Sequence, residues 1–93
     1  MLKLNPIASN MTEVTTENAV VLFSYKTPVA ALVREMGTEG VEVWHQYRTT
    51  KKWSNTTTRH INKWNPKGGA FGLMPQGFFD GLLGDSLEGG EYK

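Results

Sequence analysis

The sequence predicts an α+β fold, a three-stranded antiparallel β-meander covered by one α-helix. Three short β-branched and aromatic runs lie between residues 19 and 48, separated by Pro and Gly residues. Residues 54–64 contain neither Gly nor Pro and begin with a serine. Residues 67–93 contain eight of the ten glycines. We therefore expect a flexible N-terminal arm (1–18), a small domain (19–66) and a Gly-rich C-terminal tail (67–93) with a short apolar segment.

The length and composition limit the classes of protein. A chain of 93 residues forms one domain with a modest core. The absence of cysteine excludes disulfides, thiolate zinc sites and cysteine nucleophiles. No apolar run approaches the ~20 residues of a membrane span, and the first residues lack the apolar stretch of a signal peptide. We therefore expect an intracellular chain with no membrane partner.

The strands are predicted from short apolar runs. Residues 1–18 are polar and lack sustained periodicity, as in a mobile terminus. Residues 19–25 form a β-branched and aromatic run that ends before Pro28. Residues 29–36 contain helix-forming types, but only three residues separate them from the first run, as in a hairpin. Residues 41–48 alternate apolar and polar side chains, which predicts the third strand.

The helix is predicted from a capping residue and a one-sided pattern. Ser54 is a good N-cap, and Asn65-Pro66 ends the segment. At 100° per residue one stripe faces the sheet, and its members are Trp53, Thr57, His60, Ile61 and Trp64. Three consecutive threonines are poor helix formers, so we expect the helix to depend on tertiary packing.

Charge is segregated along the chain. Residues 1–44 carry a net −2, residues 45–79 carry +6 with no acid, and residues 80–93 carry −3. The bases of the middle block are Arg48, Lys51, Lys52, Arg59, Lys63 and Lys67. Tyr47, Trp53 and Trp64 lie among them, and cations with aromatic side chains are typical of DNA- or RNA-binding surfaces. A solvated basic face without a partner explains the same residues.

The Gly-rich tail contains one apolar group, formed by Phe78, Phe79, Leu82 and Leu83. Its spacing is that of a short amphipathic helix, and Pro75 could begin it. Three interpretations stay open: a docking motif for a partner protein, an acidic tail that folds back over the basic block, and a disordered end.

Few residues could support catalysis or metal binding. His45 and His60 are 15 residues apart, without cysteine and with no acid between them, which makes a poor zinc site. No nucleophile with a positioned base is evident, and residues 68–72 (GGAFG) lack the following Lys-Ser/Thr of a phosphate-binding loop. We therefore expect a non-enzymatic protein with no metal and no cofactor.

Two stretches carry a family resemblance. Residues 21–30 read VLFSYKTPVA and residues 47–64 read YRTTKKWSNTTTRHINKW. They resemble a family of small proteins of unknown function, encoded mainly by tailed bacteriophages, that share SY-x-TPVA and YRT…WS-x-TTS-x-HINKW motifs. The matching residues are Ser24, Tyr25, Thr27, Pro28, Val29, Ala30, Tyr47, Arg48, Thr49, Trp53, Ser54, Thr56, Thr57, His60, Ile61, Asn62, Lys63 and Trp64. Thr58 stands where serine is common. The resemblance covers about half the chain and implies a phage origin, and hence the host cytoplasm, but no activity.

Two functions fit these observations. The first is a phage accessory protein that binds nucleic acid through the basic residues. The second is a modulator of a host or anti-phage defence protein, acting through a sheet edge or the C-terminal tail. A three-stranded sheet under one helix leaves its edges open, so we also expect a homodimer.

Overall fold

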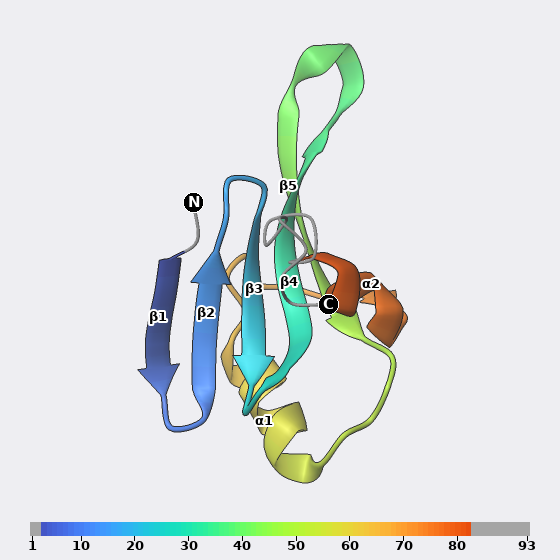
Figure 1. Cartoon of the computed structure of the whole chain (residues 1–93). Coiled ribbons are helices and arrows are strands. Elements are labelled where there is room, and N and C mark those ends of the chain that lie inside the picture. Colours follow the sequence, from blue (N-terminus) through green and yellow to red (C-terminus); the bar gives the residue numbers. More distant parts are fainter. Residues whose placement is uncertain (1–2, 83–93) are drawn as a thin grey trace.

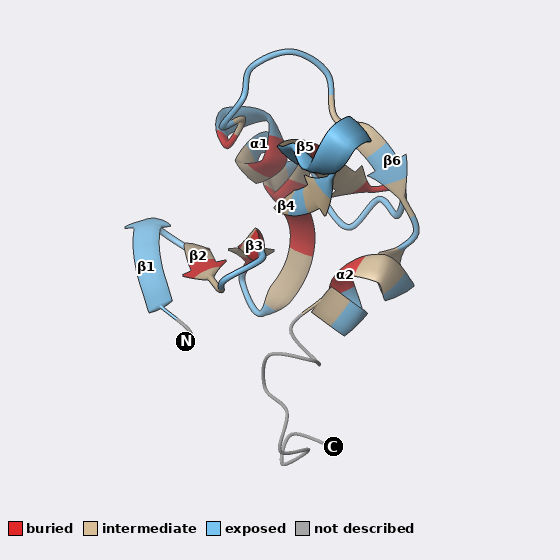
Figure 2. Cartoon of the chain, turned by 90° about the horizontal axis from the view of Figure 1, so that it is seen from above, coloured by how far each residue is buried: buried red, intermediate tan, exposed pale blue. Residues whose placement is uncertain are grey.

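The computed structural model describes residues 3–82, which form a six-stranded mixed β-sheet with one α-helix on each face (Figure 1, Figure 2). The sheet order follows the chain order, β1 to β6; strands β1–β5 are antiparallel to their neighbours, and β6 is parallel to β5. The elements are β1 (Lys3–Ala8), β2 (Met11–Thr15), β3 (Ala19–Ser24), β4 (Thr27–Met36), β5 (Glu42–Thr49), α1 (Asn55–Lys63), β6 (Gly72–Met74) and α2 (Gln76–Leu82). No helix in this part of the chain is long and apolar enough to cross a bilayer.

The predicted three-stranded meander under one helix is wrong, although the class α+β is right. The three expected strands are present as β3, β4 and β5, and the expected helix is α1. These three strands form the centre of a sheet that extends further on both sides. One sheet therefore runs across the expected boundaries at residues 18 and 66.

The predicted flexible arm instead forms two strands. β1 and β2 are joined by a tight turn in which Asn10 has a φ of 60°, a conformation that asparagine tolerates. Met11 and Val14 of β2 are buried, whereas all six residues of β1 are exposed. The polar composition therefore reflects an edge position rather than disorder.

The open edge of the sheet is protected by the residue types of β1, which Figure 2 shows as fully exposed. Pro6 has no N–H to offer a further strand, and Lys3 adds a charge. Both are common on edge strands because they discourage edge-to-edge pairing. The expected homodimer is untested by these features and stays a prediction.

The predicted Gly-rich tail contributes β6 and α2 to the fold. A Cβ at Gly72 would lie 2.7 Å from Cδ1 of Tyr47, so glycine permits β6 to approach β5 closely. In α2, Phe79 is 0% exposed. Phe78 and Leu82 are half-buried against the same cluster, and Leu83 lies outside the described residues. Because α2 is part of the core, it is not a free docking motif. The interpretation of Phe79 as a residue that docks a partner protein is therefore corrected.

Two apolar clusters hold the helices on opposite faces of the sheet (Figure 2). Consecutive residues of a strand point to opposite faces, so Leu22 packs under α1 and Val21 packs under α2. Ile61 and Trp64 fill the first cluster, and Phe79 fills the second. The central strands are consequently apolar on both sides, which explains their continuous apolar runs.

Candidate functional site

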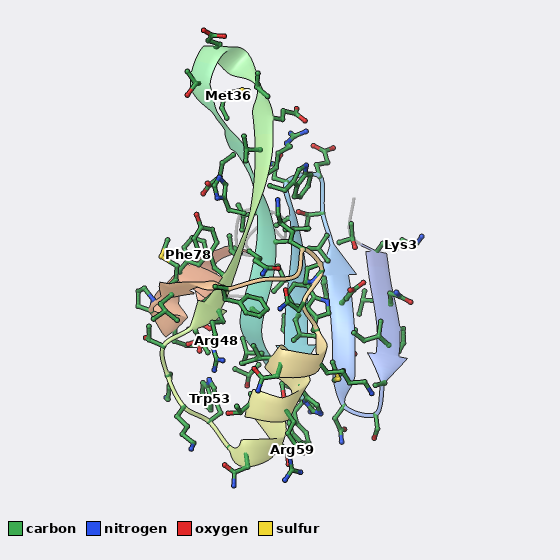
Figure 3. The ribbon with its side chains drawn as sticks, turned by 180° about the vertical axis from the view of Figure 1, so that it is seen from behind. Lys3, Met36, Arg48, Trp53, Arg59 and Phe78 are labelled. Atoms are coloured by element: carbon green, nitrogen blue, oxygen red, sulfur yellow. The ribbon has the colours of Figure 1, made fainter. Side chains whose placement is uncertain are left out.

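The predicted basic residues lie at several places in the fold. Figure 3 shows Arg48, Trp53 and Arg59 at one end of the molecule, where the loop of residues 50–54 enters α1. Lys51 and Lys52 are exposed on this loop. We call this region the basic end, defined by Arg48, Lys51, Lys52 and Arg59.

Of the remaining two predicted cations, Lys63 follows Arg59 by four residues and so lies on the same side of α1. Lys63 is exposed in the last turn of α1. The Lys67 ammonium donates to the carbonyl oxygen of Trp44 at 2.8 Å, beside β5. Sequence proximity therefore grouped six cations, of which Lys67 instead contacts β5 through its bond to Trp44.

Within residues 3–82 no ion pair joins a carboxylate to a cation of the basic end, although the carboxylate of Asp80 accepts a hydrogen bond from Gln76 at 3.1 Å. The ion pairs in this part of the chain join Arg34 to Glu42 at 3.3 Å and His45 to Glu35 at 3.6 Å, both on the β4–β5 hairpin. Lys51 instead places its ammonium 4.1 Å from the centre of the Trp53 ring, a cation–π contact. The basic end is therefore available to an external anion.

Trp53 lies on the surface, which corrects its predicted place in the core. Its side chain is 41% exposed, whereas Thr57, Ile61 and Trp64 of the same predicted stripe are buried. The indole N–H donates to Oε1 of Gln76 at 3.1 Å. Gln76 in turn donates through Nε2 to the carbonyl oxygen of Pro28 at 2.7 Å. The ring is thus exposed but held in one orientation.

A pocket of about 190 Å³ opens beside Trp53, between the β3–β4 turn and the start of α1. Its lining comes from both resemblance-bearing stretches and consists of Ser24, Tyr25, Thr27, Trp53, Ser54 and Thr57. Two of these side chains are exposed aromatics and four are hydroxyls. The fold therefore combines an aromatic, hydroxyl-lined pocket with cations that form no ion pair in the described part of the chain.

The hydroxyls continue inward as a hydrogen-bonded chain. Ser54 Oγ donates to Thr57 Oγ1 at 3.2 Å, Thr57 Oγ1 lies 2.9 Å from Ser24 Oγ, and Ser24 Oγ lies 2.7 Å from Nδ1 of His60. Because Ser54 donates to Thr57, the chain can run in one direction and end with Ser24 donating to Nδ1. That direction requires a neutral His60.

The environment of His60 favours the same neutral form. Desolvation by burial lowers the pKa of His60 below its ordinary value, and the nearby Lys63 charge lowers it further. Ser24 is 2% exposed and its hydroxyl is shared between Thr57 and His60. Nε2 of His60 has no partner among the described hydrogen bonds. A catalytic pair of a nucleophile and a histidine base needs a third group that orients the histidine, and these bonds include no such group.

We expect the stability of the protein to depend on pH through His60. Because its pKa is lower in the folded chain, the unfolded chain binds the proton more readily below about pH 6.5. The free energy of unfolding should therefore decrease as pH falls through this window and level off below the folded pKa. Urea titrations at pH 7.5 and pH 5 should show a smaller decrease for His60→Gln than for the wild type. Equal decreases in the free energy of unfolding of the wild type and His60→Gln would contradict the assignment of this pH dependence to His60.

Backbone features at the start of α1 and at the β3–β4 turn position the residues of the site. The prediction of Ser54 as N-cap is confirmed, since its Oγ accepts from the Thr57 N–H at 3.1 Å. Tyr25 has a φ of 60° at the first position of the two-residue β3–β4 turn. A left-handed conformation costs a residue other than glycine roughly 1–2 kcal/mol. An exposed tyrosine therefore occupies a turn position at which glycine would adopt the same φ at a lower conformational cost.

The sequence analysis missed three members of the site. Tyr25 was assigned to the end of the first strand and Thr27 to the break that follows it, whereas both line the pocket beside Trp53. Gln76 was read as part of the tail. A tyrosine in a two-residue hairpin turn, where Gly and Asn are usual, was the one available signal. His45 lies elsewhere, paired with Glu35, so the two histidines do not form a joint site.

Fold and site together define a small α+β protein with a mixed sheet, one helix on each face and a basic end that carries an aromatic pocket. The chain belongs to a family of unknown function, DUF8033, whose model matches residues 2–81. The match extends through β1, β2, β6 and all but the last residue of α2. No curated protein and no solved structure matches the chain.

Proposed function

We propose that this chain is a small bacteriophage accessory protein, without catalytic activity, that binds nucleic acid through its basic end in the host cytoplasm. The motif resemblance supports the phage origin. The observation that carries the binding function is a group of cations at the basic end that form no ion pair within residues 3–82, with Lys51 over the exposed ring of Trp53.

The chemistry of the basic end suits a polyanion with aromatic bases. Lysine and arginine neutralise phosphates and release counterions, which makes such binding dependent on salt. Exposed aromatic rings stack on bases of any sequence. Lys51 contributes to both roles, because its ammonium lies over Trp53 and is also exposed to solvent.

Salt-dependent binding tests this function. The fluorescence anisotropy of a labelled single-stranded oligonucleotide should report binding that weakens steeply between 50 and 200 mM salt. Lys52→Gln should reduce the slope of log K against log salt by about 0.7, the value expected for one phosphate contact on a single strand. Lys3→Gln is the matched control, because Lys3 lies on β1 away from the basic end (Figure 3). Binding that is absent, or that responds equally to both substitutions, would reject the proposal.

A protein–protein modulator is the second candidate, and exposed apolar side chains favour it. Met36 and Val41 are 70% and 60% exposed near the tip of the β4–β5 hairpin, which projects beyond the sheet (Figure 1, Figure 3). Leu4 on the edge strand is 67% exposed. Contacts through these residues would bury apolar area and persist at salt concentrations that abolish phosphate binding. A partner protein retained after nuclease treatment at high salt, and lost in Met36→Ser, would favour this candidate.

A further inference from the structure

We infer that the pocket beside Trp53 accepts one unpaired nucleobase, so that the protein binds single-stranded nucleic acid in preference to duplex. This inference rests on the proposed function and names the ligand class of the same site. It depends on the size of the pocket, on the fixed aromatic side chains at its mouth, and on the hydroxyls that line it.

The pocket has the dimensions of a site for one small aromatic ring. Its volume of about 190 Å³ is several times the ~30 Å³ that one water occupies in the liquid. Tyr25 and Trp53 both line it and are 52% and 41% exposed. They approach from separate elements, the β3–β4 turn and the loop before α1. A planar ring in the pocket would therefore lie beside two aromatic side chains.

Both aromatic side chains make contacts within the protein that limit their movement. The indole of Trp53 is fixed by its hydrogen bond to Gln76, and Gln76 is anchored to the Pro28 carbonyl. The Tyr25 ring lies 5.8 Å from the imidazole of His60 and is tilted by 44° to it. Ordered side chains lose little conformational entropy on binding. The pocket is thus preorganised for stacking.

The polar groups of the pocket match the edge of a base. Ser54 is exposed at the mouth, and Thr27 is partly exposed. The Ser54 hydroxyl already donates to Thr57, so it can only accept from a base, whereas the hydroxyl of Thr27 can donate or accept. In a duplex the bases are stacked and paired, which keeps them from such a pocket, whereas single strands can present them. Lys26, Lys51 and Lys52 flank the two aromatics in the chain and can contact the phosphates on either side.

Three labelled probes test this inference: a single-stranded oligonucleotide, its duplex, and a strand of the same length whose central nucleotides are abasic. We expect the wild type to bind the single strand about tenfold more tightly than the other two at the same salt concentration. A tenfold difference corresponds to about 1.4 kcal/mol, which the stacking of one base can supply. Duplex and abasic binding should persist weakly through the lysines.

Two variants separate stacking from charge and from folding. Tyr25→Gly removes the ring and relieves the positive φ, so the fold should persist while the preference for single strands falls. Trp53→Ala should have the same effect, with thermal melting used to confirm folding. Trp44→Ala is the matched control, because Trp44 lies on β5 opposite Arg34, toward the β4–β5 hairpin. It should leave the preference unchanged.

The outcomes distinguish this inference from the proposed function. Equal binding of the three probes, with the salt dependence and the Lys52→Gln effect intact, would overturn the base pocket and leave nucleic-acid binding standing. A preference that survives both Tyr25→Gly and Trp53→Ala would also overturn it. No binding of any probe at 50 mM salt would overturn both.

Discussion

Replacing Trp64 with alanine should lower the free energy of unfolding by about 3–5 kcal/mol. Trp64 is 6% exposed and closes the apolar cluster between α1 and the sheet, where its ring is stacked on Phe71 with centroids 6.4 Å apart. Its indole N–H also donates to Oε2 of Glu13 on β2 at 2.7 Å. The substitution removes apolar packing and a bond to a charged group together, in a domain whose total stability is of order 5–15 kcal/mol.

Urea denaturation followed by circular dichroism measures this effect. Trp64→Phe keeps most of the packing but loses the bond to Glu13, so it should fall between the wild type and Trp64→Ala. Trp53→Ala is the control, since Trp53 is partly exposed and outside both apolar clusters. If Trp64→Ala unfolded at the same urea concentration as the wild type, the packing of α1 described here would be wrong.

Replacing Phe79 with alanine should cost a similar amount, about 3–5 kcal/mol. Phe79 is completely buried under the sheet, and its ring contacts Phe78 edge-to-face with centroids 5.0 Å apart. α2 is short, so it depends on this burial rather than on its own helix propensity. A substitution in a free tail would change nothing, so the size of the effect reports whether α2 belongs to the fold.

The matched control is Leu73→Ala, three residues before α2. Leu73 is 65% exposed on β6, and its truncation should stay within about 0.5 kcal/mol of the wild type. Equal stability of Phe79→Ala and Leu73→Ala would show that α2 does not pack on the sheet in solution.

The central part of the fold was predictable because its local signals agree. The runs that became β3, β4 and β5 are apolar, short and separated by breakers, and Ser54 has the capping chemistry that its structure confirms. β1 was missed because an edge strand exposed on both faces needs no apolar alternation. β6 was missed because Gly72, which suggests a loop in sequence, is required by the close approach to Tyr47.

The candidate site was predictable only in its charges. The predicted sheet-facing stripe of the helix included Trp53, which assumes that the helical period continues back to residue 53. Ser54 has extended dihedrals of −161° and 168°, so Trp53 does not follow that period. The pocket itself depends on the meeting of Tyr25 with Trp53, from segments nearly 30 residues apart in the chain. No local pattern encodes that meeting, because the packing of α1 on the sheet creates it.

The identity of sheet order and chain order has a consequence for synthesis. As the chain leaves the ribosome, each of the strands β2–β5 pairs with the strand made just before it, through short-range contacts that close quickly. β6 differs, because it returns to β5 only after α1 has been made. Gln76, which fixes Trp53, follows later still. A nascent chain can therefore assemble most of its sheet early, while its aromatic pocket matures among the last features to form.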